Sequence, residues 1–239
     1  FLESRYKEIR NIYIRLLAGG LVLGILVFLF PAFYGEGYDA IMALLEGESE
    51  SLFRSSLFSH LGNGYLVFSL FFLCLILLKV VASSSTTGAG GVGGIFAPTL
   101  FLGGVTGFLT SSLLNKFALL NLPDNRFVLV GMAGTMAAVM HAPLTAIFLI
   151  AEITGGYSLL LPLIITSTTA YMTIKGFERH SIYHVQLAEK GELITHDKDK
   201  AVLTMMDWKK EIETDLIKVK PGDKLGDLVK VISKSKRNI

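Results

Sequence analysis

One uncharged stretch of 36 residues, residues 80–115, most constrains how this chain can fold. A single helix of that length would reach about 54 Å, whereas the hydrocarbon core of a bilayer is about 30 Å thick. A cluster of glycines and Pro98 lie near its centre. Because glycine is costly inside a helix and proline donates no backbone hydrogen bond, we predict that one helix ends near Ser83 and another starts near Ile95.

Four further uncharged runs are each long enough to cross a membrane once. They cover residues 16–35, 55–78, 127–151 and 153–174. Hydrophobic residues make up 51% of the chain, and the charged fraction of 18% lies below the roughly 25% of soluble domains. The sequence therefore predicts an all-α integral membrane domain that contains a broken helix.

Composition also excludes several classes of function. The net charge of +2 is too small to indicate a nucleic-acid partner, and the only cysteine, Cys74, can form no intrachain disulfide or cysteine metal cluster. No paired catalytic constellation is recognisable, so we do not expect an enzyme. The chain starts at Phe1 without a signal-peptide pattern, and we expect it to be a piece of a longer polypeptide.

The glycine cluster also matches a nucleotide-binding pattern. Gly88, Gly90 and Gly93 spell G-x-G-x-x-G, as in dinucleotide-binding loops. Such a loop follows a short strand and precedes an acidic residue by about 20 positions. Here the preceding apolar run is too long for a strand, and the next acid is Asp124. The sequence also lacks G-K-[ST] after these glycines, so neither nucleotide loop is favoured.

An anion site is the better interpretation of this segment. Irregular backbone at membrane depth persists only where protein or a water-filled cavity satisfies its polar groups. A helix that starts near Ile95 would expose unpaired N–H groups and the positive end of its dipole. Glycines allow an ion to approach the backbone closely. The segment is therefore predicted to bind an anion at a helix N-terminus.

Four segments carry a resemblance to a known family. The sequence GGIFAP at residues 93–98 resembles the G-x-F-x-P signature of CLC chloride channels and chloride/proton antiporters. Residues 30–41 resemble the proline-then-glycine segment of that family, residues 131–166 its A-P-L-T, acidic and L-P stretch, and residues 181–187 its tyrosine segment. The motifs occur in the family's order, across nearly the whole apolar region.

The resemblance implies a fold and a function. CLC membrane domains consist of two related halves in inverted orientation that meet at the ion site, and residues 1–190 resemble only the second half. The family's serine ligand, gating glutamate and proton-transfer glutamate belong to the first half. The resemblance thus implies a homodimeric protein of the cell membrane that moves chloride or a similar monovalent anion, as a channel or a proton-coupled antiporter. It implies the N-terminal half as partner, and we expect no conduction by this chain alone.

The resemblance also assigns site residues. The selectivity motif comprises Gly94, Ile95, Phe96, Ala97 and Pro98. Backbone N–H groups of Ile95 and Phe96 and the hydroxyl of Tyr183 would donate to the anion. Without the resemblance, Tyr183 reads as a membrane-interface tyrosine, because charged residues precede it.

Other polar residues have less specific interpretations. Glu152, between two apolar runs, is interpreted as a hydrogen-bonded structural carboxylate. His180 and His184 have the spacing of a metal pair but lack an H-E-x-x-H motif, so we interpret them as interface residues. Lys79 is expected to snorkel or pair, and His141 to cap or line a turn.

The composition changes towards the C-terminus. Residues 191–212 are predicted to form a polar cytoplasmic linker, and residues 213–239 to form a strand, a turn and a helix with Asp223 as N-cap. One face of that helix would carry Leu225, Leu228, Val229 and Ile232. This order resembles the beginning of an α/β CBS domain, a module that binds adenosine ligands, whereas a basic cytoplasmic tail is the simpler interpretation. The alternative function is a membrane-anchored nucleotide-sensing regulatory protein.

Overall fold

The computed structural model describes residues 5–6, 8–62, 64–117, 121–178, 180–189 and 221–234. The chain divides into two units, Phe1–Ala188 and Glu189–Ile239. Every regular element within the described ranges is a helix, in agreement with the predicted all-α membrane domain.

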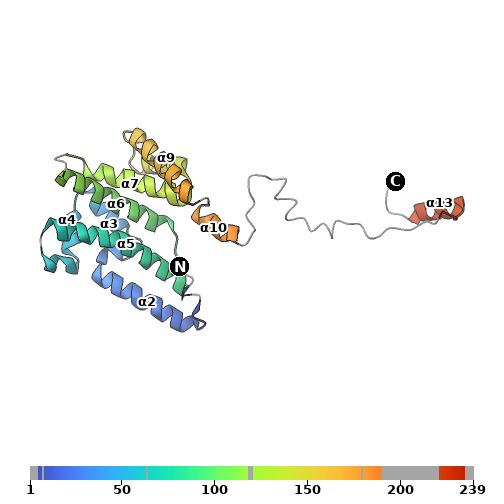
Figure 1. Cartoon of the computed structure of the whole chain (residues 1–239), viewed down its shortest axis with the longest axis horizontal. Coiled ribbons are helices and arrows are strands. Elements are labelled where there is room, and N and C mark those ends of the chain that lie inside the picture. Colours follow the sequence, from blue (N-terminus) through green and yellow to red (C-terminus); the bar gives the residue numbers. More distant parts are fainter. Residues whose placement is uncertain are drawn as a thin grey trace. The chain divides into compact units, whose positions relative to one another are not determined.

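Three helices of the first unit are long and apolar enough to cross a membrane. They are α2 (Ile12–Leu29), α5 (Tyr65–Ala89) and α6 (Phe96–Phe117). Helix α5 packs between α2 and α6, so the three lie side by side (Figure 1). By length and composition, these helices are suited to the interior of a membrane.

Four more helices follow α6 in the described part of the chain before the second unit's α13. They are α7 (Asp124–Met140), α8 (Pro143–Ile153), α9 (Leu160–Phe177) and α10 (Ile182–Glu189). Helix α7 packs between α6 and α9, which extends the row of neighbouring helices to α2, α5, α6, α7 and α9 (Figure 1). Helix α8 contacts both α7 and α9.

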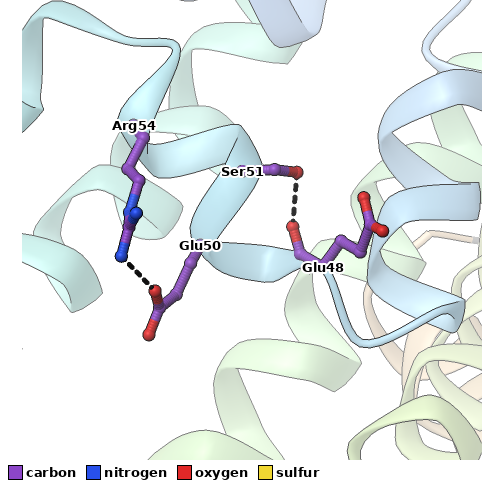
Figure 2. Close-up of polar contacts among 4 residues, drawn as sticks. All are labelled: Glu48, Glu50, Ser51 and Arg54. Atoms are coloured by element: carbon purple, nitrogen blue, oxygen red, sulfur yellow. Dashed lines mark hydrogen bonds and ion pairs between the residues drawn. The ribbon is translucent and has the colours of Figure 1, made fainter.

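Short elements connect α2 to α5. They are η1 (Pro31–Phe33), α3 (Tyr38–Leu45), α4 (Ser49–Arg54) and η2 (Leu57–Leu61). Figure 2 shows α4, where the Ser51 hydroxyl donates to the Glu48 carbonyl at 2.7 Å and Arg54 pairs with Glu50 at 2.8 Å. Both partners of the ion pair are exposed, so it contributes at most about 1 kcal/mol to stability.

The predicted helix end near Ser83 is wrong, because α5 continues to Ala89. The hydroxyls of Thr86 and Thr87 donate to carbonyls one turn earlier, at 2.9 and 3.2 Å, so this polar stretch remains helical. The predicted start near Ile95 is confirmed, since α6 begins at Phe96. The break therefore occupies only the residues between these two helices.

The run of residues 127–151 does not form one crossing. His141 adopts a left-handed conformation with φ 55°, and Pro143 is the first residue of α8, so the run is divided into α7 and α8. Proline in a helix interior clashes with the preceding turn and removes a hydrogen bond. The expectation of a single crossing was wrong, and the prediction that His141 caps a turn is confirmed.

Helices α6 and α7 approach each other closely through glycines. A Cβ at Gly107 would collide with the Phe127 carbonyl, and one at Gly131 would collide with the Gly103 carbonyl. Small residues at such a spacing let helix backbones touch, as is common in membrane helix pairs. This contact fixes the position of α6, whose N-terminus carries the predicted selectivity motif.

The second unit contains one described helix, α13 (Leu225–Lys234). Its predicted apolar face is exposed within the described residues, at Leu225, Leu228, Val229 and Ile232. The carbonyl of Lys224 accepts the first hydrogen bonds of α13, from the N–H groups of Asp227 and Leu228. The N-cap role of Asp223 stays a prediction. The predicted linker and strand, residues 191–220, lie outside the described residues.

Candidate anion site

The site begins where α5 ends. Gly90 is left-handed, with φ 102° and ψ 10°, a conformation that glycine adopts without steric cost. The N–H groups of Gly90 and Gly91 donate to the carbonyls of Thr87 and Thr86 at 3.1 and 2.9 Å. This is a Schellman motif, which closes the helix by satisfying its last carbonyls.

The next helix, α6, starts at Phe96, seven residues after the last residue of α5. The Ile95 carbonyl accepts hydrogen bonds from the Thr99 N–H at 3.1 Å and from the Thr99 hydroxyl at 2.7 Å, which makes Ile95 the N-cap of α6. The N–H groups of Phe96 and Ala97 precede the first turn and have no intrahelical acceptor. Pro98 has no N–H. The N-terminus of α6 therefore presents unpaired donors and the positive end of a 22-residue helix dipole.

Helix α7 holds this N-terminus in place. The Thr135 hydroxyl lies 3.1 Å from the carbonyls of both Thr99 and Gly131, so it can donate to either helix. Together with the glycine contacts between α6 and α7, this bond restricts how far the first turn of α6 can move.

A cavity of about 730 Å³ opens onto the start of α6. Helices α2 and α5, the segment between η1 and α3, and residues 92–94 and 96–98 form its walls. Its polar lining residues include Tyr34, Glu36, Tyr38, Lys79, Ser83, Thr86 and Thr87. A space lined by hydroxyls, a cation and a helix N-terminus is suited to a small anion.

Most of the predicted selectivity motif faces this cavity. Gly94, Phe96, Ala97 and Pro98 line it, and Ile95 is half-buried outside the lining. Tyr183 lies in the first turn of α10, with 54% of its surface exposed, and does not line the cavity. The roles of Ile95, Phe96 and Tyr183 as anion ligands stay predictions.

Lys79 is a buried, charged lining residue that sequence reasoning did not assign to the site. It lies in the middle of α5 and is only 5% exposed. Its Nζ donates to the Glu36 carbonyl at 3.4 Å and lies 4.4 Å from the centre of the Phe101 ring. A lone cation between two long uncharged runs was the signal that could have identified it.

The other polar residues singled out from the sequence lie elsewhere. Glu152 is exposed at the end of α8, and its role as a structural carboxylate stays a prediction. His184 Nδ1 lies 2.6 Å from the Ser181 hydroxyl. Within the described residues, no group of three or more metal-ligating side chains is present.

Comparison with known proteins identifies the family. The sequence profile described as voltage gated chloride channel matches residues 1–175. The chain belongs to this family. A ClcB-like protein of Ralstonia nicotianae is 32% identical over 180 residues, which cover 75% of this chain and 38% of that protein. The voltage-gated ClC-type chloride channel ClcB of Escherichia coli O81 is also 32% identical over 180 residues, covering 73% and 38%.

The matched segment is only a part of these relatives. The chain spans 38% of the length of these curated relatives. The family match includes α2 to α8 and nearly all of α9, and therefore contains the cavity, Lys79 and the start of α6.

Proposed function

We propose that this chain is the second of two inverted halves of a CLC-type membrane domain, and that the complete protein moves chloride across the membrane. One observation carries the proposal: the uncovered N-terminus of α6 opens into a cavity that also contains a buried lysine. Membership of the voltage gated chloride channel family supports it.

The proposed anion ligands are the backbone N–H groups of Ile95 and Phe96 and the hydroxyl of Tyr183. The start of α6 supports the first two, because the amide of Phe96 has no acceptor within its helix. The proposed role of Tyr183 is supported only by the resemblance of residues 181–187 to the tyrosine segment of the family. We further propose a homodimer, a cytoplasmic C-terminal tail, and a CBS domain that starts in the second unit. Nucleotide binding by that domain stays a prediction.

Chloride flux tests the proposal. The complete protein, reconstituted in liposomes loaded with chloride, should release chloride when a potassium ionophore removes the electrical barrier. Simultaneous recording of external pH distinguishes the two mechanisms, because an antiporter takes up protons as chloride leaves and a channel does not. Liposomes loaded with gluconate instead of chloride provide the control for proton movement that does not depend on chloride. Chloride release no faster than that of protein-free liposomes would contradict the proposal.

A further inference from the structure

The inference concerns Lys79 and rests on the proposed function. Its ammonium is buried at a point where three segments far apart in the chain meet. The carbonyl of Glu36 comes from the loop before α3, Phe33 comes from η1, and Phe101 comes from α6. The Phe101 and Phe33 ring centres lie 4.4 and 5.5 Å from Nζ.

These contacts do not neutralise the charge. An ammonium has three N–H donors, and the structure gives Lys79 one acceptor, at the long distance of 3.4 Å. Among the residues that the structure describes, no carboxylate oxygen lies within 4.0 Å of Nζ. Aromatic rings attract a cation through their quadrupoles but carry no net charge. The buried positive charge therefore keeps its field.

The positive charge of Lys79 acts on the cavity at the N-terminus of α6. Lys79, Ser83 and Thr86 all line the cavity from one face of α5. Phe96 and Pro98 line it from the opposite side of the helix break. An anion in this space would therefore experience two positive sources, the lysine ammonium and the dipole end of α6, and one negative source, the Glu36 side chain.

We propose that Lys79 is an affinity-determining residue for chloride: its buried charge stabilises a monovalent anion inside the cavity. The lysine acts through its field and not as the ligand that selects the ion. Phe33, Phe101 and the Glu36 carbonyl hold the ammonium in position. Gly37 permits this arrangement, because a Cβ there would lie 2.6 Å from Phe101 Cδ2 and 3.2 Å from Nζ.

The proposal predicts that removal of the Lys79 charge weakens chloride binding without lowering the stability of the fold. A buried cation without a counter-charge is costly to fold, because it is removed from water without full compensation. Lys79→Met keeps a long, unbranched side chain and removes the positive charge. The variant should unfold at the same or a higher temperature than the wild type in chloride-free buffer, and it should bind chloride more weakly. A lysine that serves only to stabilise the fold would show the reverse.

The experiment uses the complete protein in detergent, titrated with sodium chloride against a sodium gluconate background. Calorimetry gives the chloride affinity, and thermal unfolding gives the shift of the midpoint with chloride, which follows from binding to the folded state. A unit charge about 10 Å from an anion, at an effective dielectric constant of about 20, changes affinity roughly tenfold. Lys79→Met should therefore weaken chloride binding by about that factor, and Lys79→Arg should restore most of it.

A control addresses an acidic residue of the same cavity. Glu36 lines the same cavity, so Glu36→Gln removes a negative charge without altering the backbone carbonyl that holds Lys79. It should leave chloride affinity unchanged or raise it. A decrease in affinity that matches Lys79→Met would show that folding of this region, and not its charge, controls binding, and would overturn the proposal.

The remaining outcomes are also decisive. Chloride affinity unchanged in Lys79→Met, with the wild type binding normally, would overturn the role of Lys79 and leave the proposed function intact. If neither Lys79→Met nor Lys79→Gln folds while Lys79→Arg does, the charge is part of a structural ion pair and the proposal is wrong. A wild-type protein that neither binds nor transports chloride would contradict the proposed function itself.

Discussion

At the residue scale, the proposed site combines backbone donors with one side-chain donor, and substitutions can separate them. Tyr183→Phe removes one hydrogen bond to a charged partner, so chloride affinity should fall about ten- to a hundredfold. Ile95→Val keeps the backbone amide and removes one methylene. It should leave chloride affinity nearly unchanged and cost about 0.5 to 1.5 kcal/mol of stability. Chloride titration calorimetry of the complete protein measures both effects.

The exposure of Tyr183 bears on the comparison between Tyr183→Phe and Ile95→Val. Tyr183 is 54% exposed and does not line the cavity, so its role as an anion ligand depends on the arrangement of the complete protein. Equal chloride affinity in Tyr183→Phe and the wild type would remove Tyr183 from the site. A larger loss in Ile95→Val than in Tyr183→Phe would show that the proposed division between backbone and phenol is wrong.

At the element scale, the position of the site depends on the contact between α6 and α7. Gly107→Ala would press a methyl group into the Phe127 carbonyl, and overpacking of this kind typically costs about 1 to 3 kcal/mol. Gly104→Ala is the matched control on the same helix. Its nearest neighbours are the side-chain atoms Cγ1 of Val128 at 3.3 Å and Cγ of Met132 at 3.5 Å, which can adjust.

Thermal unfolding of the complete protein in detergent measures this difference. Gly107→Ala should lower the midpoint of unfolding, whereas Gly104→Ala should change it little, because alanine also favours the helix by up to about 1 kcal/mol. Equal midpoints for the two variants would mean that α6 and α7 do not approach through Gly107.

At the scale of the whole molecule, the residues that line the cavity all belong to the unit Phe1–Ala188. Ending the complete protein after residue 190 should therefore leave chloride flux per folded molecule unchanged. Flux from liposomes, normalised to protein that elutes as a single species, measures this. Loss of flux in a folded truncated protein would favour the alternative in which the C-terminal segment controls activity, as in a nucleotide-sensing regulatory protein.

Much of the fold could be predicted from local sequence. Uncharged runs identified the apolar helices, and the start of α6 followed from the glycines and Pro98, because these residues act within one or two turns of their own position. The break before α8 was missed, although its signal is local, since Pro143 cannot continue the helix that precedes it. The error at Ser83 had a local cause as well: hydroxyls of Thr86 and Thr87 bond within the helix, so a polar stretch did not end it.

The sequence by itself determined the apolar runs that form helices and the start of α6, and it placed the chain's glycine and proline motif at that helix N-terminus. Only the tertiary structure decided that this N-terminus opens into a cavity with Lys79. The ammonium is held by Phe33, Glu36 and Phe101, which lie 46, 43 and 22 positions away in the chain. Local propensity carries no information about such contacts, because they form only when α5, α6 and the loop before α3 pack together.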